Sequence, residues 1–288
     1  MAPDKAVVPL HVPGLTWLPS GQSALSGDLL ELDDRLDGVF RSWAGQRGAA
    51  AYRVPTFIAA SDLARLDYFY SFPHLITFPV TLEASEANLA RFAEQAPAAG
   101  EVRLTETAPV RDVLTPAACY HFYSLLRGRA LPGPIYLTTR ATCFRREAFY
   151  VPLERQWAFS MREIVCLGTA DEVKAFLEAE QARVAGFAAR IGLPLEFQNA
   201  TDPFFNPSRN PKYLMQKLEP VKTEMVFQGR LAIGSLNFHR NYFGEAFEIR
   251  RAGAEAFSGC VAFGIERWVG AVVRQFGPKA GDWPSLAQ

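Results

Sequence analysis

One stretch of the chain combines charged and aromatic side chains in a spacing that suits a nucleotide. Residues 142–163 contain two strand-like segments joined by a polar loop, and the two segments carry Arg145, Glu147, Phe159 and Glu163. Because side chains alternate between the faces of a strand, Arg145 and Glu147 share a face, as do Phe159 and Glu163. Arginine can bind a phosphate through two parallel hydrogen bonds, and a ring can stack on a base. The hairpin is therefore a candidate nucleotide site, although an ordinary amphipathic surface hairpin explains the same alternation.

Four cysteines form a second group of chemically useful side chains. They stand at positions 119, 143, 166 and 260, without a Cys-x-x-Cys pair. The first residues contain no apolar segment typical of an export signal, so we expect free thiols in a cytoplasmic protein. Each thiol is then either a metal ligand or an inert buried side chain, and burial is the usual state of a free cysteine.

Composition excludes several classes of protein. The 288 residues include 30 Lys and Arg and 30 Asp and Glu, which gives a net charge of zero. A neutral chain lacks the basic balance that drives nonspecific binding to nucleic acid. No apolar run approaches the roughly 20 residues that a membrane helix needs. A hydrophobic content of 49% is typical of a globular domain.

The hydrophobic periodicity predicts an α+β domain. Adjacent strands cluster in sequence, which favours a mainly antiparallel sheet flanked by helices and excludes a parallel βαβ array. Neither a Gly-x-Gly-x-x-Gly motif nor a phosphate-binding P-loop is present. A loop rich in Asn and Pro is expected over residues 199–211. Helices are expected over residues 26–47, 83–95, 116–126, 169–191 and 257–276, and strands over residues 50–59, 223–227, 230–237 and 246–250.

Three segments in order resemble the motifs of class II aminoacyl-tRNA synthetases. The hairpin at 142–163 is similar to motif 2, which reads Phe-Arg-x-Glu, a loop, then Arg and Phe. Residues 259–267, Gly-Cys-Val-Ala-Phe-Gly-Ile-Glu-Arg, resemble motif 3, a junction between a strand and a helix. Residues 30–59, with Pro55, are similar to the degenerate motif 1. The resemblance implies a single synthetase-like catalytic domain over residues 1–288.

Within that class, the chain resembles the truncated relatives of atypical zinc-dependent seryl-tRNA synthetases, the amino acid:[carrier protein] ligases. We expect no tRNA-binding arm, because the first motif begins only a few dozen residues into the chain. That branch holds Zn²⁺ with a Cys, Glu, Cys set, which implies Cys119, Glu163 and Cys260 here, one zinc per subunit. These three are 44 and 97 residues apart, so only the fold could unite them. Three such ligands leave a fourth tetrahedral position for the amino group of a substrate.

The resemblance also assigns roles in ATP binding. It implies that Arg145 neutralises charge on the α-phosphate, that Glu147 and Phe159 hold adenine, and that Arg267 contacts the γ-phosphate. Arg155 is a further candidate for the phosphates, although loop arginines are often only solvated. Magnesium is expected with ATP, and Glu224 is the candidate ligand because the segment after Arg230 lacks the family's usual carboxylate.

The reaction implied is activation of a small amino acid, glycine or alanine, as an adenylate, followed by transfer to the phosphopantetheine thiol of a carrier protein. The helix-plus-loop element at 169–211 is the candidate carrier contact, and a helix that merely covers the sheet is the alternative. No tRNA or membrane partner is expected, and the family implies a homodimer. A compact aminoacyl-tRNA synthetase and a noncatalytic paralogue that binds or regulates remain alternatives.

Overall fold

A seven-stranded sheet forms the centre of the computed structural model, which describes residues 12–95 and 100–287. All neighbouring strands are antiparallel except β3 and β7. The predicted α+β class, with a mainly antiparallel sheet flanked by helices, is confirmed. Across the sheet the order is β3 (Ala50–Tyr52), β7 (Ile135–Phe144), β8 (Ala158–Gly168), β14 (Phe257–Gly264), β11 (Leu231–Arg240), β10 (Lys222–Phe227) and β9 (Leu195–Ala200).

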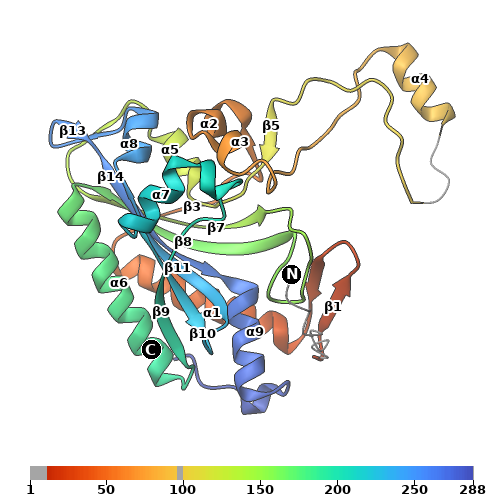
Figure 1. Cartoon of the computed structure of the whole chain (residues 1–288). Helices are drawn as coiled ribbons and strands as arrows, with labels where there is room; N and C mark the ends of the chain where they lie inside the picture. The colour runs from red at the N-terminus through yellow and green to blue at the C-terminus, as the bar shows by residue number, and fades with distance from the viewer. Residues whose placement is uncertain (1–11, 96–99, 288) are drawn as a thin grey trace.

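Three helices cover one face of this sheet (Figure 1): α1 (Asp28–Gln46), α6 (Ala170–Arg190) and α9 (Ile265–Phe276). Aromatic side chains hold them together. The rings of Phe40 on α1 and Phe263 on β14 stack in parallel, with centroids 3.9 Å apart, and Trp268 on α9 packs edge-on against Phe40. Burying such large rings contributes most of the hydrophobic stabilisation of a layer.

Sequence signals explain why α6 begins where it does. The Thr169 side chain accepts from the Glu172 backbone N–H, and the Glu172 carboxylate accepts from the Thr169 N–H, which is a complete capping box. The helix then lies close against β14 at Gly259, where an added Cβ would come within 2.7 Å of Val173. A glycine is needed there because the helix approaches the strand so closely.

The opposite face of the sheet is covered by shorter helices and carries the second apolar cluster, which includes Cys119 and Cys260. These helices connect strands of the sheet, and a cavity lies between them and the sheet. They are α2 (Ala60–Arg65), α3 (Tyr68–Ser71), α5 (Tyr120–Leu125), α7 (Pro211–Leu218) and α8 (Tyr242–Phe247).

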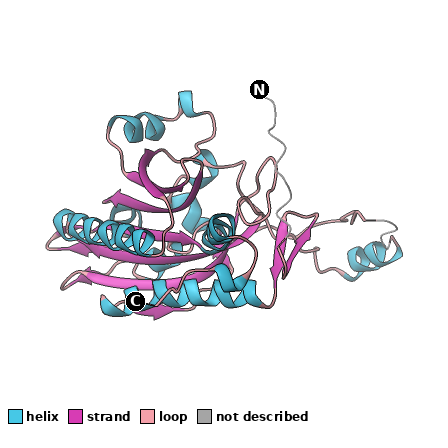
Figure 2. Cartoon of the chain, turned by 90° about the horizontal axis from the view of Figure 1, so that it is seen from below, coloured by secondary structure: helices cyan, strands magenta, loops and turns pink. Residues whose placement is uncertain are grey.

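Two elements lie outside the main layers. The hairpin of β1 (Leu15–Leu18) and β2 (Gln22–Leu25) packs beside the motif-2 loop. Between β4 (Phe57–Ala59) and β5 (Asp112–Leu114) the chain leaves the body as an arm that carries α4 (Glu86–Glu94), as Figures 1 and 2 show. A small separate sheet contains β6 (Ala130–Leu131), β12 (Arg250–Arg251) and β13 (Ala254–Glu255), and 3-10 turns span Pro207–Arg209 and Ala280–Asp282.

Several local predictions were wrong. Residues 257–264 form a strand, so the last helix begins only at Ile265, as the motif-3 resemblance indicated. A continuous apolar run suits a central strand as well as a buried helix. The strand expected at 246–250 is also wrong, because α8 continues to Phe247 and only Arg250 of this range lies in a strand, β12. The loop predicted at 199–211 begins with the end of β9. No described helix is long and apolar enough to cross a membrane.

Candidate active site

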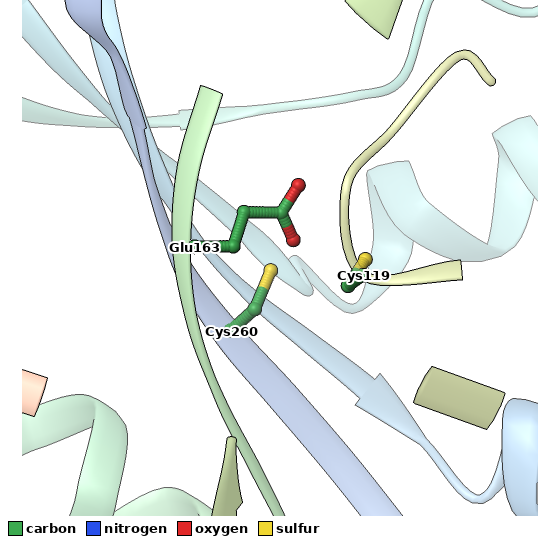
Figure 3. Close-up of side chains that lie close together, drawn as sticks. All are labelled: Cys119, Glu163 and Cys260. Atoms are coloured by element: carbon green, nitrogen blue, oxygen red, sulfur yellow. The ribbon is translucent and has the colours of Figure 1, made fainter. Parts of the chain in front are cut away.

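Cys119, Glu163 and Cys260 meet on the face of the sheet that bears the short helices. Cys119 immediately precedes α5, Glu163 lies on β8 and Cys260 lies on β14. The register pairs Glu163 with Ala262 and Cys260 with Val165, so the two side chains are diagonal neighbours on one face. The three ligand atoms lie within 4.8 Å of one another, and Figure 3 shows the side chains converging. The structure thus unites the three residues that the resemblance selected.

The trio has the donor chemistry of a metal site with an open position. All three side chains are buried, with exposures of 4%, 1% and 2% in chain order. One Glu163 oxygen, Oε1, accepts from the Ala118 N–H at 3.1 Å. The other, Oε2, has no hydrogen-bond partner among the described residues. A buried, unpaired carboxylate oxygen beside two thiols is costly unless a cation binds it, so the residues fit Zn²⁺.

Polar neighbours hold the Cys260 sulfur. Asn237 Nδ2 donates to Cys260 Sγ at 3.3 Å, and His239 Nε2 lies 3.6 Å from the same atom. His239 Nδ1 in turn contacts Tyr123 Oη at 3.1 Å and Ser258 Oγ at 3.2 Å. These contacts fix the sulfur in place, as outer partners of metal ligands commonly do.

The pKa values of the protein groups reflect their burial and mutual contacts. Loss of solvent and the neighbouring Cys260 raise the pKa of Glu163 to about 8. A hydrogen bond from Cys119 lowers the pKa of Cys260, whereas the same bond and burial raise the pKa of Cys119. Three acidic groups packed together repel one another's negative charge, and a divalent cation would relieve that repulsion.

A cavity of about 450 Å³ opens above the trio. Apolar side chains from α3, α7 and α8 form much of its wall, including Tyr68, Met215 and Phe243. A second cavity of about 110 Å³ adjoins it, and Arg145 and Met161 line both. The trio and the predicted nucleotide residues therefore face neighbouring spaces.

The smaller cavity gathers the residues predicted to bind ATP. It is lined by Arg145, Glu147, Phe159, Glu224 and Arg267. Arg145 donates from Nε to the Pro116 carbonyl at 2.9 Å and lies over the Phe159 ring at 5.3 Å from its centroid. The backbone carbonyl sets the direction of the guanidinium, so its remaining N–H groups are oriented in advance.

Arg267 is fixed in a similar way by backbone groups. It donates from Nε to the Glu154 carbonyl at 2.6 Å and from Nη1 to the Ala232 carbonyl at 2.8 Å. Burial and the positive charges of Arg145 and Arg155 lower its pKa to about 10. Among the residues that the structure describes, neither Arg145 nor Arg267 forms an ion pair. Clustered cations without anionic partners favour a polyanionic ligand.

The remaining predicted residues are occupied by protein contacts. Arg155, on the loop between β7 and β8, donates to Glu147 at 2.6 Å, so these two candidates neutralise each other. Glu224 lies 3.4 Å from Lys222 Nζ. That lysine also contacts Asp202 at 3.1 Å.

Two groups at the site have no role in the sequence-based prediction. Glu266, next to Arg267, lines the smaller cavity and accepts from the Ser160 N–H at 2.8 and 2.9 Å. Asn237 holds Cys260. The alternation of Ser235, Asn237 and His239 along β11 is the signal that could have identified Asn237, because all three line the larger cavity.

The element proposed to contact a partner divides into two parts. Helix α6 covers the sheet face away from the trio, where its buried side chains join the aromatic core. The segment after β9 lies on the cavity side, and Asp202, Phe204 and Pro211 line the 450 Å³ cavity. Exposed Leu214 and Leu218 follow on α7.

Comparison with characterised proteins gives two similar chains from Bradyrhizobium diazoefficiens. Amino acid–[acyl-carrier-protein] ligase 1 is 34% identical over 248 residues, which cover 83% of this chain and 76% of the relative. Ligase 2 is 33% identical, covering 92% and 80% respectively. The type-2 serine–tRNA ligase of Methanopyrus kandleri is 27% identical over 60% of this chain but only 36% of its own length. No protein-family model matches the chain.

Solved structures agree on the fold. Methanopyrus kandleri SerRS, crystallised with Aquifex aeolicus tRNASec, superposes with a TM-score of 0.77 at 21% identity, covering 94% of this chain and 57% of that one. A Naegleria fowleri serine–tRNA ligase with AMP gives 0.65 at 13% identity, covering 89% and 51%. The chain thus spans little more than half of these synthetases, and the likeness establishes a class II synthetase catalytic fold.

Proposed function

Since the chain belongs to the amino acid–[acyl-carrier-protein] ligase family, we propose that it activates a small amino acid with ATP and transfers it to the phosphopantetheine thiol of a carrier protein. The observation that carries this proposal is the adjacency of two sites. A buried Cys, Glu, Cys trio and an unpaired cluster of arginines line cavities that share Arg145. A ligase of this kind must hold an amino acid and a triphosphate side by side.

In the first step the carboxylate oxygen of the amino acid attacks the α-phosphorus, and pyrophosphate leaves with the electron pair of the broken P–O bond. Zn²⁺ held by Cys119, Glu163 and Cys260 would bind the unprotonated α-amino group and orient the amino acid. Arg145 neutralises the charge that develops on the α-phosphate oxygens. Its position between the two cavities supports this role.

The nucleotide contacts the residues that line the smaller cavity. Arg267 contacts the γ-phosphate, Phe159 stacks on adenine, and Glu147 accepts from the adenine amino group. For this, Glu147 must exchange its present partner, Arg155, which is then free to reach the phosphates. Glu224, which contacts Lys222, would provide a protein ligand for the Mg²⁺ that accompanies ATP.

In the second step the thiol of the carrier's arm loses its proton to water, and its sulfur attacks the carbonyl carbon of the adenylate. AMP leaves and a thioester remains. The acceptor sulfur belongs to the partner, so the chain needs no nucleophilic cysteine. We propose that the carrier docks at residues 199–211, the part of the 169–211 element that lines the cavity, and at α7, which follows it and also lines the cavity.

The amino acid is proposed to be glycine or alanine. A single methyl group changes binding in an apolar pocket by only about 1–3 kcal/mol, so both are candidates. We further propose a homodimer, as in the synthetase class, and no tRNA acceptor. The zero net charge supports the latter.

ATP–pyrophosphate exchange across the amino acids tests the proposal. We expect exchange with glycine or alanine, and transfer of the labelled amino acid to a phosphopantetheinylated carrier but not to tRNA. Charging of tRNA would instead identify a compact synthetase. No exchange with any amino acid would leave a noncatalytic paralogue and refute the enzyme proposed here. Sedimentation velocity tests the dimer.

A further inference from the structure

The loop between β7 and β8, residues 145–157, is anchored to the C-terminal helix on one side. Leu153 packs so closely on α9 that a Cβ at Gly270 would lie 3.1 Å from the Leu153 Cβ. Arg267, also on α9, donates to the carbonyl of Glu154. Helix α9 therefore fixes the loop at Leu153 and Glu154, close to Arg267, the residue proposed to contact the γ-phosphate.

The other side of the loop is held by the β1–β2 hairpin, more than 120 residues earlier in the chain. The Trp157 N–H donates to the Gly21 carbonyl at 2.8 Å. Ser23 Oγ donates to the side-chain oxygen of Gln156. Gly21 itself closes the hairpin, with its N–H donating to Leu18 at 3.0 Å. The hairpin thus binds the backbone and a side chain at the start of the return strand.

A glycine at position 21 permits the closest of these contacts. Its φ is +82°, and a Cβ there would lie 2.3 Å from the Tyr150 ring, so the ring rests directly on the glycine. Tyr150 Oη accepts from the Glu147 N–H at 3.4 Å, and the ring stacks on Trp157 at 6.3 Å between centroids. Contacts therefore run from Gly21 through Tyr150 to the backbone of Glu147.

We propose that the β1–β2 hairpin is a positioning element for the nucleotide, in which Gly21 and Tyr150 hold the loop that carries Glu147 and Arg155. This inference rests on the proposed function, because it assigns ATP to that loop. A loop ordered before the ligand arrives loses less conformational entropy on binding. Trp157 also contributes, because its carbonyl accepts from the Arg145 N–H at 2.9 Å and its indole donates to Thr77 Oγ1 at 2.8 Å.

The decisive variant is Gly21→Val, with Gly48→Val as its matched control. Gly48 also has a positive φ, +70°, but nothing lies within 4 Å of its Cβ position. Both variants acquire backbone strain, and only Gly21→Val displaces Tyr150. We expect the KM for ATP in pyrophosphate exchange to rise about 10- to 100-fold in Gly21→Val. The KM for the amino acid and the zinc content should equal those of Gly48→Val.

A double-mutant cycle with Tyr150→Ala tests whether Gly21→Val raises the KM for ATP by displacing Tyr150. Tyr150→Ala should also raise the KM for ATP, and Gly21→Val added to it should cause no further rise, because the displaced ring is already absent. Tyr150→Phe keeps the ring but loses the hydrogen bond from the Glu147 N–H, so it should raise the KM for ATP less than Tyr150→Ala does. If Gly21→Val does not fold, Tyr150→Ala and Ser23→Ala give the same measurement with milder changes.

Failure of this inference is distinct from failure of the proposed function. Wild-type exchange together with an unchanged KM for ATP in Tyr150→Ala and Gly21→Val would overturn the positioning role alone. An equal rise in the KM for the amino acid would also overturn it, because that marks a general loss of structure. Absence of both exchange and calorimetric ATP binding in the wild type would refute the proposed function, and the nucleotide role of the hairpin with it.

Discussion

At the residue scale, the proposed metal ligands of the larger cavity are two sulfurs and one carboxylate oxygen. The ligand atoms of these residues lie within 4.8 Å of one another, and Glu163 Oε2 has no hydrogen-bond partner among the described residues. Cys166 provides the contrast. It lies three residues from Glu163 on the same strand, but its side chain joins the aromatic core on the other face of the sheet.

Replacing a proposed ligand should remove the metal. We expect Cys119→Ala and Cys260→Ala to lose zinc and at least about 100-fold of exchange activity, more than the loss typical of an outer-shell partner. Metal analysis of the purified variants measures the zinc. Cys166→Ala is the matched control and should retain one zinc per chain. Stoichiometric zinc in either ligand variant would refute the assignment.

Glu266 should give the stability a dependence on pH. Burial raises its pKa from the ordinary 4.5 to about 7. Between these values the folded protein keeps a proton that the unfolded chain has lost, so the free energy of unfolding falls as the pH rises. Allowing for partial exposure of the side chain, the loss is about 1–2 kcal/mol.

Urea unfolding of wild type and Glu266→Gln at pH 5 and pH 7.5 checks this effect. The glutamine variant has no proton to lose, so its free energy of unfolding should fall less than that of wild type over this range. Parallel changes in the two proteins would contradict the prediction and show that other groups control the pH dependence.

At the scale of elements, α6 and α7 belong to opposite faces of the sheet although both lie near the segment proposed for carrier contact. Leu214 and Leu218 are exposed on α7, at 52% and 79%. Its neighbours Met215 and Gln216 line the cavity. The exposed face of α6 is charged, and its apolar face is fully used by the core.

Charge introduced on α7 should impair transfer without affecting activation. We expect Leu214→Glu with Leu218→Glu to lower kcat/KM for the carrier about tenfold, the loss of one or two interface contacts. Pyrophosphate exchange should be unchanged. Glu178→Lys, on the exposed face of α6, is the control and should leave both half-reactions intact. A loss caused by Glu178→Lys alone would move the carrier site to α6.

At the scale of the whole molecule, the trio ties together three segments that lie far apart in the sequence. Cys119 precedes α5, and the strands β8 and β14 supply the other two ligands. A metal that binds only the folded state stabilises that state by mass action. The site should therefore contribute to the stability of the protein as well as to its chemistry.

Chelation should lower the Tm of the wild type. We expect a decrease of roughly 5–10 °C, the size that a well-saturated ligand produces in a chain of this length. Thermal scans with and without chelator measure the decrease. Cys119→Ala should show no such difference, because it holds no zinc. An equal shift in both proteins would point to another effect of the chelator.

The sequence by itself determined much of this protein. The alternation of residues 142–163 and the motif-3 segment predicted the nucleotide residues, and all of these except Arg155 line one cavity. Local signals over residues 26–47 and 169–191 predicted α1 and α6. Such local signals are readable because each depends on a few neighbouring residues.

Only the tertiary structure decided the rest. The meeting of Cys119 with Cys260 depends on strand register and on where α5 lies, and no local pattern encodes either. Local periodicity alone could not distinguish the strand at 257–264 from a helix, and its pairing with two neighbouring strands of the sheet holds it as a strand. The contacts between the β1–β2 hairpin and the loop at residues 145–157 likewise join segments separated by more than 120 residues. Where the local sequence allows more than one conformation, long-range packing decides between them, and this packing brings Cys119, Glu163 and Cys260 together.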